Sequence, residues 1–142
     1  MTPEPSSGTP SLQSLATLLI VEDEPAVRML MVRALSREPY QLLFAEAPSE
    51  ALQIASDPAL RLDVVVIDLG LPEMSGFALG LKIRELHPRV ALVFDSGYSE
   101  RDWPKGPRPS DYLFLEKPFT PEELRACVRK ALRSSEHHDL AS

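Results

Sequence analysis

The chain of 142 residues has the length of one globular domain and can bury a single core. Its apolar and charged fractions, 44% and 25%, are those of an ordinary soluble protein, and its net charge of −6 argues against a nucleic-acid-binding surface. One cysteine excludes an internal disulfide, and no Cys/His cluster has zinc spacing. Because no apolar run is long enough for a membrane span and no signal layout opens the chain, we expect a cytoplasmic protein.

The two ends of the chain differ in composition from its middle. Residues 1–15 are rich in Pro, Ser, Thr and Gly, and such a segment buries too little apolar surface to offset its ordering entropy. We expect a disordered N-terminal tail over 1–15, one domain over 16–134 and a C-terminal tail over 135–142. Since so few residues follow the last predicted helix, we expect no DNA-binding or enzymatic output domain.

Apolar runs alternate with segments of helical spacing along this domain. In the first helical segment, apolar residues fall at i, i+3, i+4, i+7 and i+8, and Pro25 suits the first turn. The last helix has the clearest start, because Thr120, Pro121 and Glu123 form a capping box. The full pattern predicts strands at 17–21, 40–45, 62–67, 90–95 and 112–116, and helices at 24–36, 48–57, 76–86 and from 121 onward.

The strands are almost wholly apolar, which is typical of a sheet covered on both faces. Their alternation with helices indicates parallel strands joined by right-handed crossovers. We therefore predict an α/β fold with a doubly wound, five-stranded parallel sheet. Sheets of this kind place their sites beyond the carboxyl ends of the strands.

Polar residues follow four of the predicted strands. Glu22 and Asp23 follow the first, Asp68 the third, Ser96 the fourth and Lys117 the fifth. Each alone is weak, because a lone aspartate often caps a loop and a lone lysine is usually solvated. The carboxyl ends of parallel strands share one edge, so three carboxylates, a hydroxyl and an ammonium are expected to meet there, and together they indicate a site.

The region from about 17 to 134 resembles the receiver domain of two-component response regulators. The resemblance lies in the order and spacing of VEDEP at 21–25, IDLGLPEMSG at 67–76, SGY at 96–98 and EKPF at 116–119. It implies a flavodoxin-like strand order, 2-1-3-4-5. It leaves open whether the chain is a single-domain regulator or a receiver excised from a hybrid histidine kinase.

The resemblance also implies a metal site. By it, Asp68 is the phosphoacceptor, and Glu22 and Asp23 are the acidic pair that helps bind Mg²⁺. Gly70 matches the position that offers its backbone carbonyl to the metal. Neighbouring carboxylates repel one another, and a hard dication with oxygen ligands relieves that repulsion.

The remaining matched positions concern the transfer and its output. Lys117 matches the lysine that pairs with the acceptor carboxylate, and the Lys117–Pro118 bond is expected to be cis. Ser96 matches the switch hydroxyl and Phe114 the aromatic switch, although a static core phenylalanine is the alternative for Phe114. Mg²⁺ and Lys117 would neutralise the charge of the transferred phosphoryl group, which Ser96 can then hydrogen-bond.

The resemblance implies partners and leaves alternatives open. A histidine kinase or histidine phosphotransfer protein would supply the phosphoryl group, a downstream protein would read it, and a weak homodimer is left open. No external substrate is expected, only self-catalysed phosphotransfer and dephosphorylation. A phosphorylation-independent scaffold is the alternative, whereas a haloacid-dehalogenase-type phosphatase would need an aspartate where Gly70 stands.

The sequence departs from the family pattern in the connection at 99–110, SERDWPKGPRPS, where receivers have a fourth helix. Its prolines and glycine exclude a full helix across 103–110, so we predict a shortened or unwound fourth helix. Trp103 is interpreted either as a ring packed over the sheet edge or as a partner contact. Tyr98 either shields the phosphoryl group from water or packs on the loop.

Overall fold

The computed structural model of the protein describes residues 15–103 and 106–141, the last seven of these as backbone only. Strands and helices alternate along it. In chain order they are β1 (Thr17–Val21), α1 (Pro25–Leu35), β2 (Gln41–Ala45), α2 (Pro48–Ala55), β3 (Val64–Asp68), α3 (Gly76–Leu86), β4 (Ala91–Ser96), β5 (Leu113–Glu116) and α4 (Pro121–Ala141). The tail expected over 1–15 lies, but for its last residue, outside the described residues.

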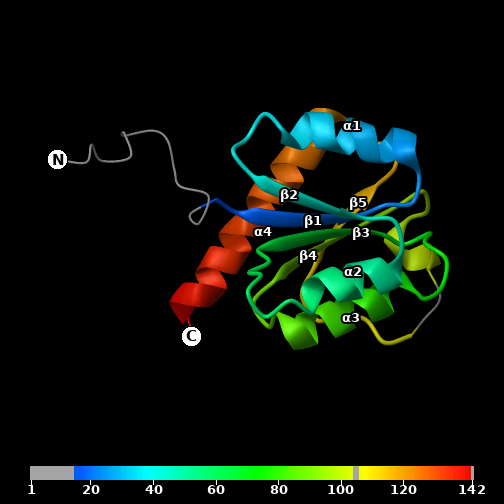
Figure 1. The fold of residues 1–142 in the computed structure, drawn as a ribbon. Helices are drawn as coiled ribbons and strands as arrows, with labels where there is room; N and C mark the ends of the chain where they lie inside the picture. Colours follow the sequence, from blue (N-terminus) through cyan, green and yellow to red (C-terminus); the bar gives the residue numbers. More distant parts are fainter. Residues whose placement is uncertain (1–14, 104–105, 142) are drawn as a thin grey trace.

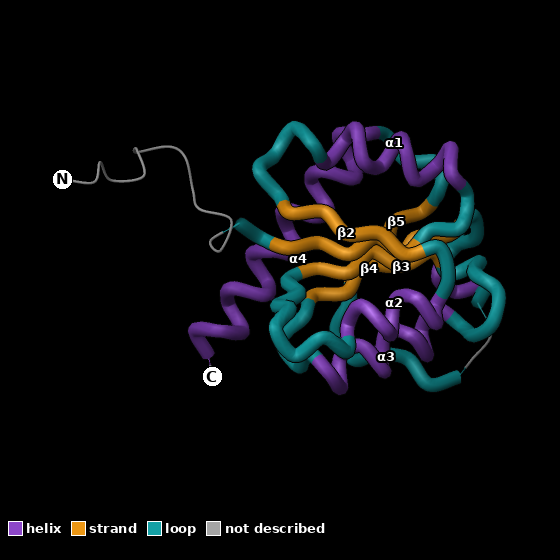
Figure 2. Tube along the Cα trace, viewed as in Figure 1, coloured by secondary structure: helices purple, strands orange, loops and turns teal. Residues whose placement is uncertain are grey.

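The strands form one five-stranded parallel sheet in the order β2-β1-β3-β4-β5. Helices α1 and α4 cover one face of the sheet, and α2 and α3 cover the other (Figure 1). The same view coloured by secondary structure shows the sheet as a single layer between two helical layers (Figure 2). The predicted doubly wound fold and its strand order are confirmed.

The central strands β1 and β3 are buried along their whole length, and β4 is buried from its second residue on. Successive side chains point to opposite faces of a strand, so each strand serves both helical layers. Val64 and Val66 of β3 and Val93 of β4 pack toward α1 and α4, whereas Ile67 and Phe94 pack toward α2 and α3. This parity decides which face each residue at the strand ends occupies.

Two helix starts follow from local side chains. At α4 the Thr120 N–H donates to Glu123 Oε1 at 2.8 Å and the Glu123 N–H donates to Thr120 Oγ1 at 3.0 Å, which confirms the predicted capping box. At α3 Ser75 Oγ accepts the Phe77 N–H at 3.1 Å. That cap closes the loop that leads from β3 into α3.

The fourth crossover contains no α-helix among its described residues, so the label α4 belongs to the last helix. It holds one 3-10 turn, Glu100–Asp102, in which the Asp102 N–H donates to the Ser99 carbonyl at 3.0 Å. The predicted shortening of the family's fourth helix is therefore confirmed on both sides of 104–105, which lie outside the described residues.

The C-terminal end differs from the sequence-based expectation. Helix α4 continues to Ala141, beyond residue 134, where the sequence predicts that the domain ends and a tail begins. No glycine or proline follows Pro121, so the sequence contains no residue that stops the helix earlier. The helix is described by its backbone alone over 135–141, residue 142 lies outside the described residues, and the domain bounds stay a prediction.

Gly80 sets the distance between α3 and the sheet. A Cβ atom at this position would lie 2.7 Å from Phe94 Cζ and 3.2 Å from Leu92 Cδ1. The Phe94 ring cannot retreat easily, because it is fully buried and packs edge-on against Phe77, with ring centroids 4.8 Å apart. Close approach therefore outweighs the cost of a glycine within a helix, about 1 kcal/mol.

We predict that Gly80→Ala lowers the free energy of unfolding by about 1–3 kcal/mol, the usual cost of overpacking a core, although alanine favours helices. Urea unfolding measures the change. Gly97→Ala is the matched control, since nothing lies within 4 Å of its added Cβ. A stabilised Gly80→Ala variant would contradict the packing described for α3.

Candidate functional site

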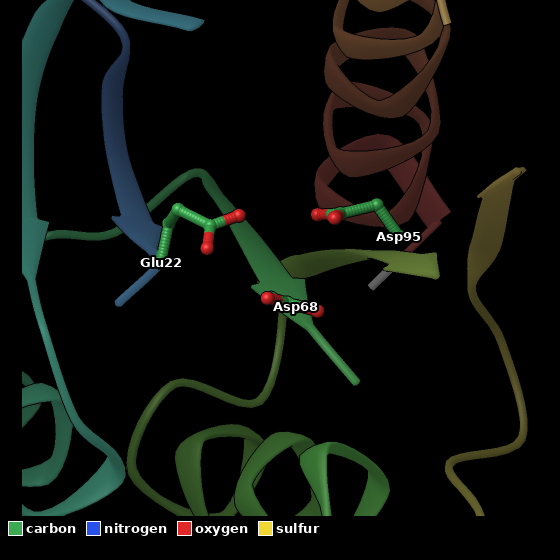
Figure 3. A group of neighbouring side chains, drawn as sticks. All are labelled: Glu22, Asp68 and Asp95. Carbon is green, nitrogen blue, oxygen red and sulfur yellow. The ribbon is translucent and has the colours of Figure 1, made fainter. Parts of the chain in front are cut away.

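Three carboxylates meet at the carboxyl ends of the central strands. Glu22 follows β1, Asp68 ends β3 and Asp95 is the penultimate residue of β4. One oxygen from each lies within 4.8 Å of the others, and Figure 3 shows the side chains facing a common space. Strand parity accounts for this arrangement, because Asp68 and Asp95 are register partners on the face that α1 and α4 cover.

The Lys117 ammonium lies among these carboxylates. Its Nζ is 3.6 Å from Glu22 Oε1, 3.6 Å from Asp68 Oδ2 and 3.3 Å from Asp95 Oδ1. The backbone N–H of Lys117 donates to the Ser96 carbonyl at 2.7 Å. This bond extends the β4–β5 pairing and fixes the backbone from which the Lys117 side chain projects. Partial burial favours the neutral amine, but the three carboxylates outweigh it and raise the Lys117 pKa.

Glu22 is fully buried at the entrance to α1. Burial and the Asp68 charge raise its pKa to about 8, against the opposing effects of the Glu24 N–H and Lys117. The Glu24 N–H donates to Glu22 Oε2 at 3.1 Å, while Oε1 accepts no hydrogen bond from a described residue. This oxygen is the one that faces the Lys117 ammonium at 3.6 Å, so a positive charge rather than a hydrogen bond is its partner.

Asp68 is held in place by the loop that follows it. The Gly70 N–H donates to Asp68 Oδ1 at 2.9 Å, so Oδ2 is the oxygen that faces Lys117. Gly70 therefore contacts Asp68 through its backbone N–H. Metal binding by the Gly70 carbonyl stays a prediction. Asp23, the other predicted metal ligand, is exposed and is not among the three clustered carboxylates.

Asp95 also belongs to the site, although it is not among the site residues predicted from the sequence. Only 1% of its surface is exposed, and neither carboxylate oxygen accepts a hydrogen bond from a described residue. Burial raises its pKa to about 6, although Lys117 opposes the shift. A lone acid inside the apolar run VALVFD was the available signal, because a charge at a fully covered position of a sheet demands a partner.

Ser96 faces the opposite side of β4 from Asp95. It is 1% exposed, and its Oγ accepts the Tyr98 N–H at 2.9 Å and the Trp103 indole N–H at 2.7 Å. The Trp103 ring packs against the core on the α2 and α3 side, and the exposed Tyr98 ring meets it edge-on at 6.0 Å. Trp103 is thus packed, as one interpretation held, but its hydrogen bond to Ser96 was not predicted.

Phe114 lies on β5 as the register partner of Phe94 and is half-buried against the same core. Its role as an aromatic switch stays a prediction. The Lys117–Pro118 bond is cis, as the resemblance implied.

The three clustered carboxylates fit a hard divalent cation. All the clustered ligand atoms are carboxylate oxygens, the chemistry that Mg²⁺ prefers, and Glu22 Oε1 and both Asp95 oxygens lack hydrogen bonds from described residues. Glu22, Asp68 and Asp95 all contribute to this donor set, and Lys117 Nζ lies 3.3 Å from Asp95 and 3.6 Å from each of the other two. The exposed Asp23 lies next to Glu22 in the chain, at the rim.

Among known proteins, the chain is similar to a sensor kinase and to transcriptional regulatory proteins. The chain is 38% identical over 126 residues to the sensor kinase CckA of Brucella abortus (strain 2308), covering 88% of this chain and 13% of the kinase. It is 33% identical over 118 residues to the transcriptional regulatory protein CreB of Escherichia coli (strain K12), covering 82% of this chain and 51% of the regulator. The chain therefore spans about half of the length of one relative and about an eighth of the other.

Solved structures give the same result. The receiver domain from hybrid histidine kinase CckA superposes with a TM-score of 0.70 at 32% identity, covering 82% of this chain and 99% of that one. A response regulator receiver protein from Sinorhizobium medicae WSM419 gives a TM-score of 0.76 at 22% identity over 87% of this chain and 98% of that one, a likeness of fold alone. No helix in the described part of the chain could cross a membrane.

Residues 18–129 of the chain match the family described as the response regulator receiver domain. Fold, site and sequence similarity agree, and the chain belongs to the receiver domains of two-component systems.

Proposed function

We propose that the protein is a phosphoacceptor receiver whose Asp68 takes a phosphoryl group in a Mg²⁺-dependent reaction and thereby switches a protein–protein interaction. One observation carries the proposal: the Lys117 ammonium lies 3.6 Å from Asp68 Oδ2 at the open end of the sheet. The side chain of Asp68 is 10% exposed, so the carboxylate is held firmly yet reachable from solvent. A positioned carboxylate beside a fixed cation is what phosphoryl transfer requires.

In the proposed step an oxygen of Asp68 forms a bond to phosphorus while the bond from phosphorus to the donor breaks. The donor is a phosphohistidine nitrogen or the oxygen of an acyl phosphate, and it leaves with the electron pair. Lys117 neutralises charge on the phosphoryl oxygens, and the Gly70 N–H keeps Asp68 in position. Bound Mg²⁺, held by Glu22 and Asp68 with Asp23 at the rim, would supply further charge neutralisation.

The relatives support the proposed partners. A sensor kinase that shares 38% identity with this chain supports a histidine kinase or a histidine phosphotransfer protein as the phosphoryl source. The added charge at Asp68 would act on Ser96 and Phe114 and so alter the surface offered to a downstream protein. Our proposal puts the reaction in the cytoplasm, involves neither nucleic acid nor a membrane as a partner, and is compatible with a weak homodimer.

We predict that acetyl phosphate with Mg²⁺ adds one phosphoryl group, about 80 Da, to the protein as read by intact mass. Asp68→Asn should abolish the gain, and omission of Mg²⁺ should reduce it strongly. Asp57→Asn is the matched control, because Asp57 follows α2 at the opposite edge of the sheet. No gain in the parent protein, or an equal gain in Asp68→Asn, would favour the phosphorylation-independent scaffold.

The proposed site carries an excess of negative charge when no metal or phosphoryl group is bound. Three carboxylates face one ammonium, and Asp95 is the one with no hydrogen bond to either oxygen from a described residue. Removing a charge from water without such bonds costs free energy, which the ion pair offsets only in part. The unphosphorylated domain therefore carries a destabilising group at Asp95.

We predict that Asp95→Asn raises the free energy of unfolding by about 1 kcal/mol at pH 8 in EDTA, because it removes one unsolvated charge at constant volume. Urea unfolding gives the value. Asp63→Asn serves as the control: the Asp63 carboxylate accepts the Thr17 N–H at 2.8 Å and should yield no gain. A marked loss of stability in Asp95→Asn would mean that the Lys117–Asp95 pair is a net stabilising interaction.

A further inference from the structure

The Ser96 hydroxyl accepts a hydrogen bond from a residue that lies outside the motifs shared with the receiver family. Trp103 Nε1–H donates to Ser96 Oγ at 2.7 Å, and the Tyr98 N–H donates to the same oxygen at 2.9 Å. A serine hydroxyl offers two acceptor positions and one proton. Because two donors fill the acceptor positions, the proton of Ser96 is the only group left to form a further hydrogen bond, and it can only be donated.

The segment that carries Trp103 is anchored independently of Ser96. The Arg108 guanidinium donates to the Trp103 carbonyl at 3.1 Å and stacks over the Phe77 ring at 4.4 Å. Ser99 Oγ–H donates to Asp102 Oδ2 at 2.6 Å within the 3-10 turn. The turn that carries the indole is therefore held by its own hydrogen bonds. It lies where the sequence pattern of the family would begin a helix.

We propose that Trp103 is a positioning residue for the phosphorylation site: its indole N–H orients the Ser96 hydroxyl so that the serine proton is donated to a phosphoryl group on Asp68. This inference rests on the proposed phosphoacceptor function. Packing alone would not require an indole, since a phenylalanine fills a similar volume but has no N–H to donate. The same hydrogen bond links the state of Asp68 to the surface segment at 98–103.

The contact is measured first in the unphosphorylated protein. Trp103 is the only tryptophan, so a ¹⁵N–¹H correlation spectrum contains one indole signal. Ser96→Ala should move that signal and speed its exchange with solvent, whereas Ser96→Thr, which keeps the hydroxyl, should restore it. If Ser96→Ala leaves the indole signal unchanged, the proposal is overturned. Trp103 itself is not substituted in this test.

The effect on the reaction is measured by a double-mutant cycle. Trp103→Phe should slow phosphorylation by acetyl phosphate about fivefold, the loss expected from one hydrogen bond. In the Ser96→Ala background the same substitution should have almost no effect, because the hydroxyl it orients is gone. A merely structural role would slow both backgrounds alike, and that result would overturn the proposal.

Intact mass separates this proposal from the function on which it rests. If the parent protein gains a phosphoryl group and Trp103→Phe gains it at the parent rate, the positioning role fails and the phosphoacceptor stands. If the parent protein gains none under saturating acetyl phosphate and Mg²⁺, the phosphoacceptor function fails, and the role of Trp103 in it fails as well.

Discussion

The site depends on one ammonium group that offsets three carboxylates. Lys117 Nζ lies within 3.6 Å of Glu22, Asp68 and Asp95, and each of these acids is largely removed from water. Acids packed this closely could not all stay charged without a nearby cation. The lysine therefore offsets part of the charge of these acids, and the remaining negative charge makes this end of the sheet a place where a bound dication or a transferred phosphoryl group changes the electrostatic balance.

The fold brings these groups together through strand parity. A parallel sheet ends its strands at one edge, and alternation along each strand sends neighbouring residues to opposite faces. Asp95 accordingly joins Asp68 and Lys117, while the adjacent Ser96 turns toward Trp103. One strand, β4, thus contributes a charge to the acidic cluster on one face and a hydroxyl, with its own donors, on the other.

Much of this arrangement could be predicted from the sequence. The layered fold followed from apolar strands alternating with helices, and the convergence of Glu22, Asp68 and Lys117 followed from their positions after parallel strands. Asp95 was missed because a strand buried on both faces has no polar alternation to reveal which way a residue points. The Trp103 bond to Ser96 depends on the path of an irregular turn, for which local propensities supply no rule.

The most direct test of the central interaction is urea unfolding of the parent protein and Lys117→Met at pH 8, in EDTA and in Mg²⁺, with the exposed Lys82→Met as control. Our account predicts that Lys117→Met loses more than about 1 kcal/mol in EDTA, because it leaves buried carboxylates without their cation. It also predicts that Mg²⁺ stabilises this variant more than the parent. Equal stability of the two proteins in EDTA would contradict the account.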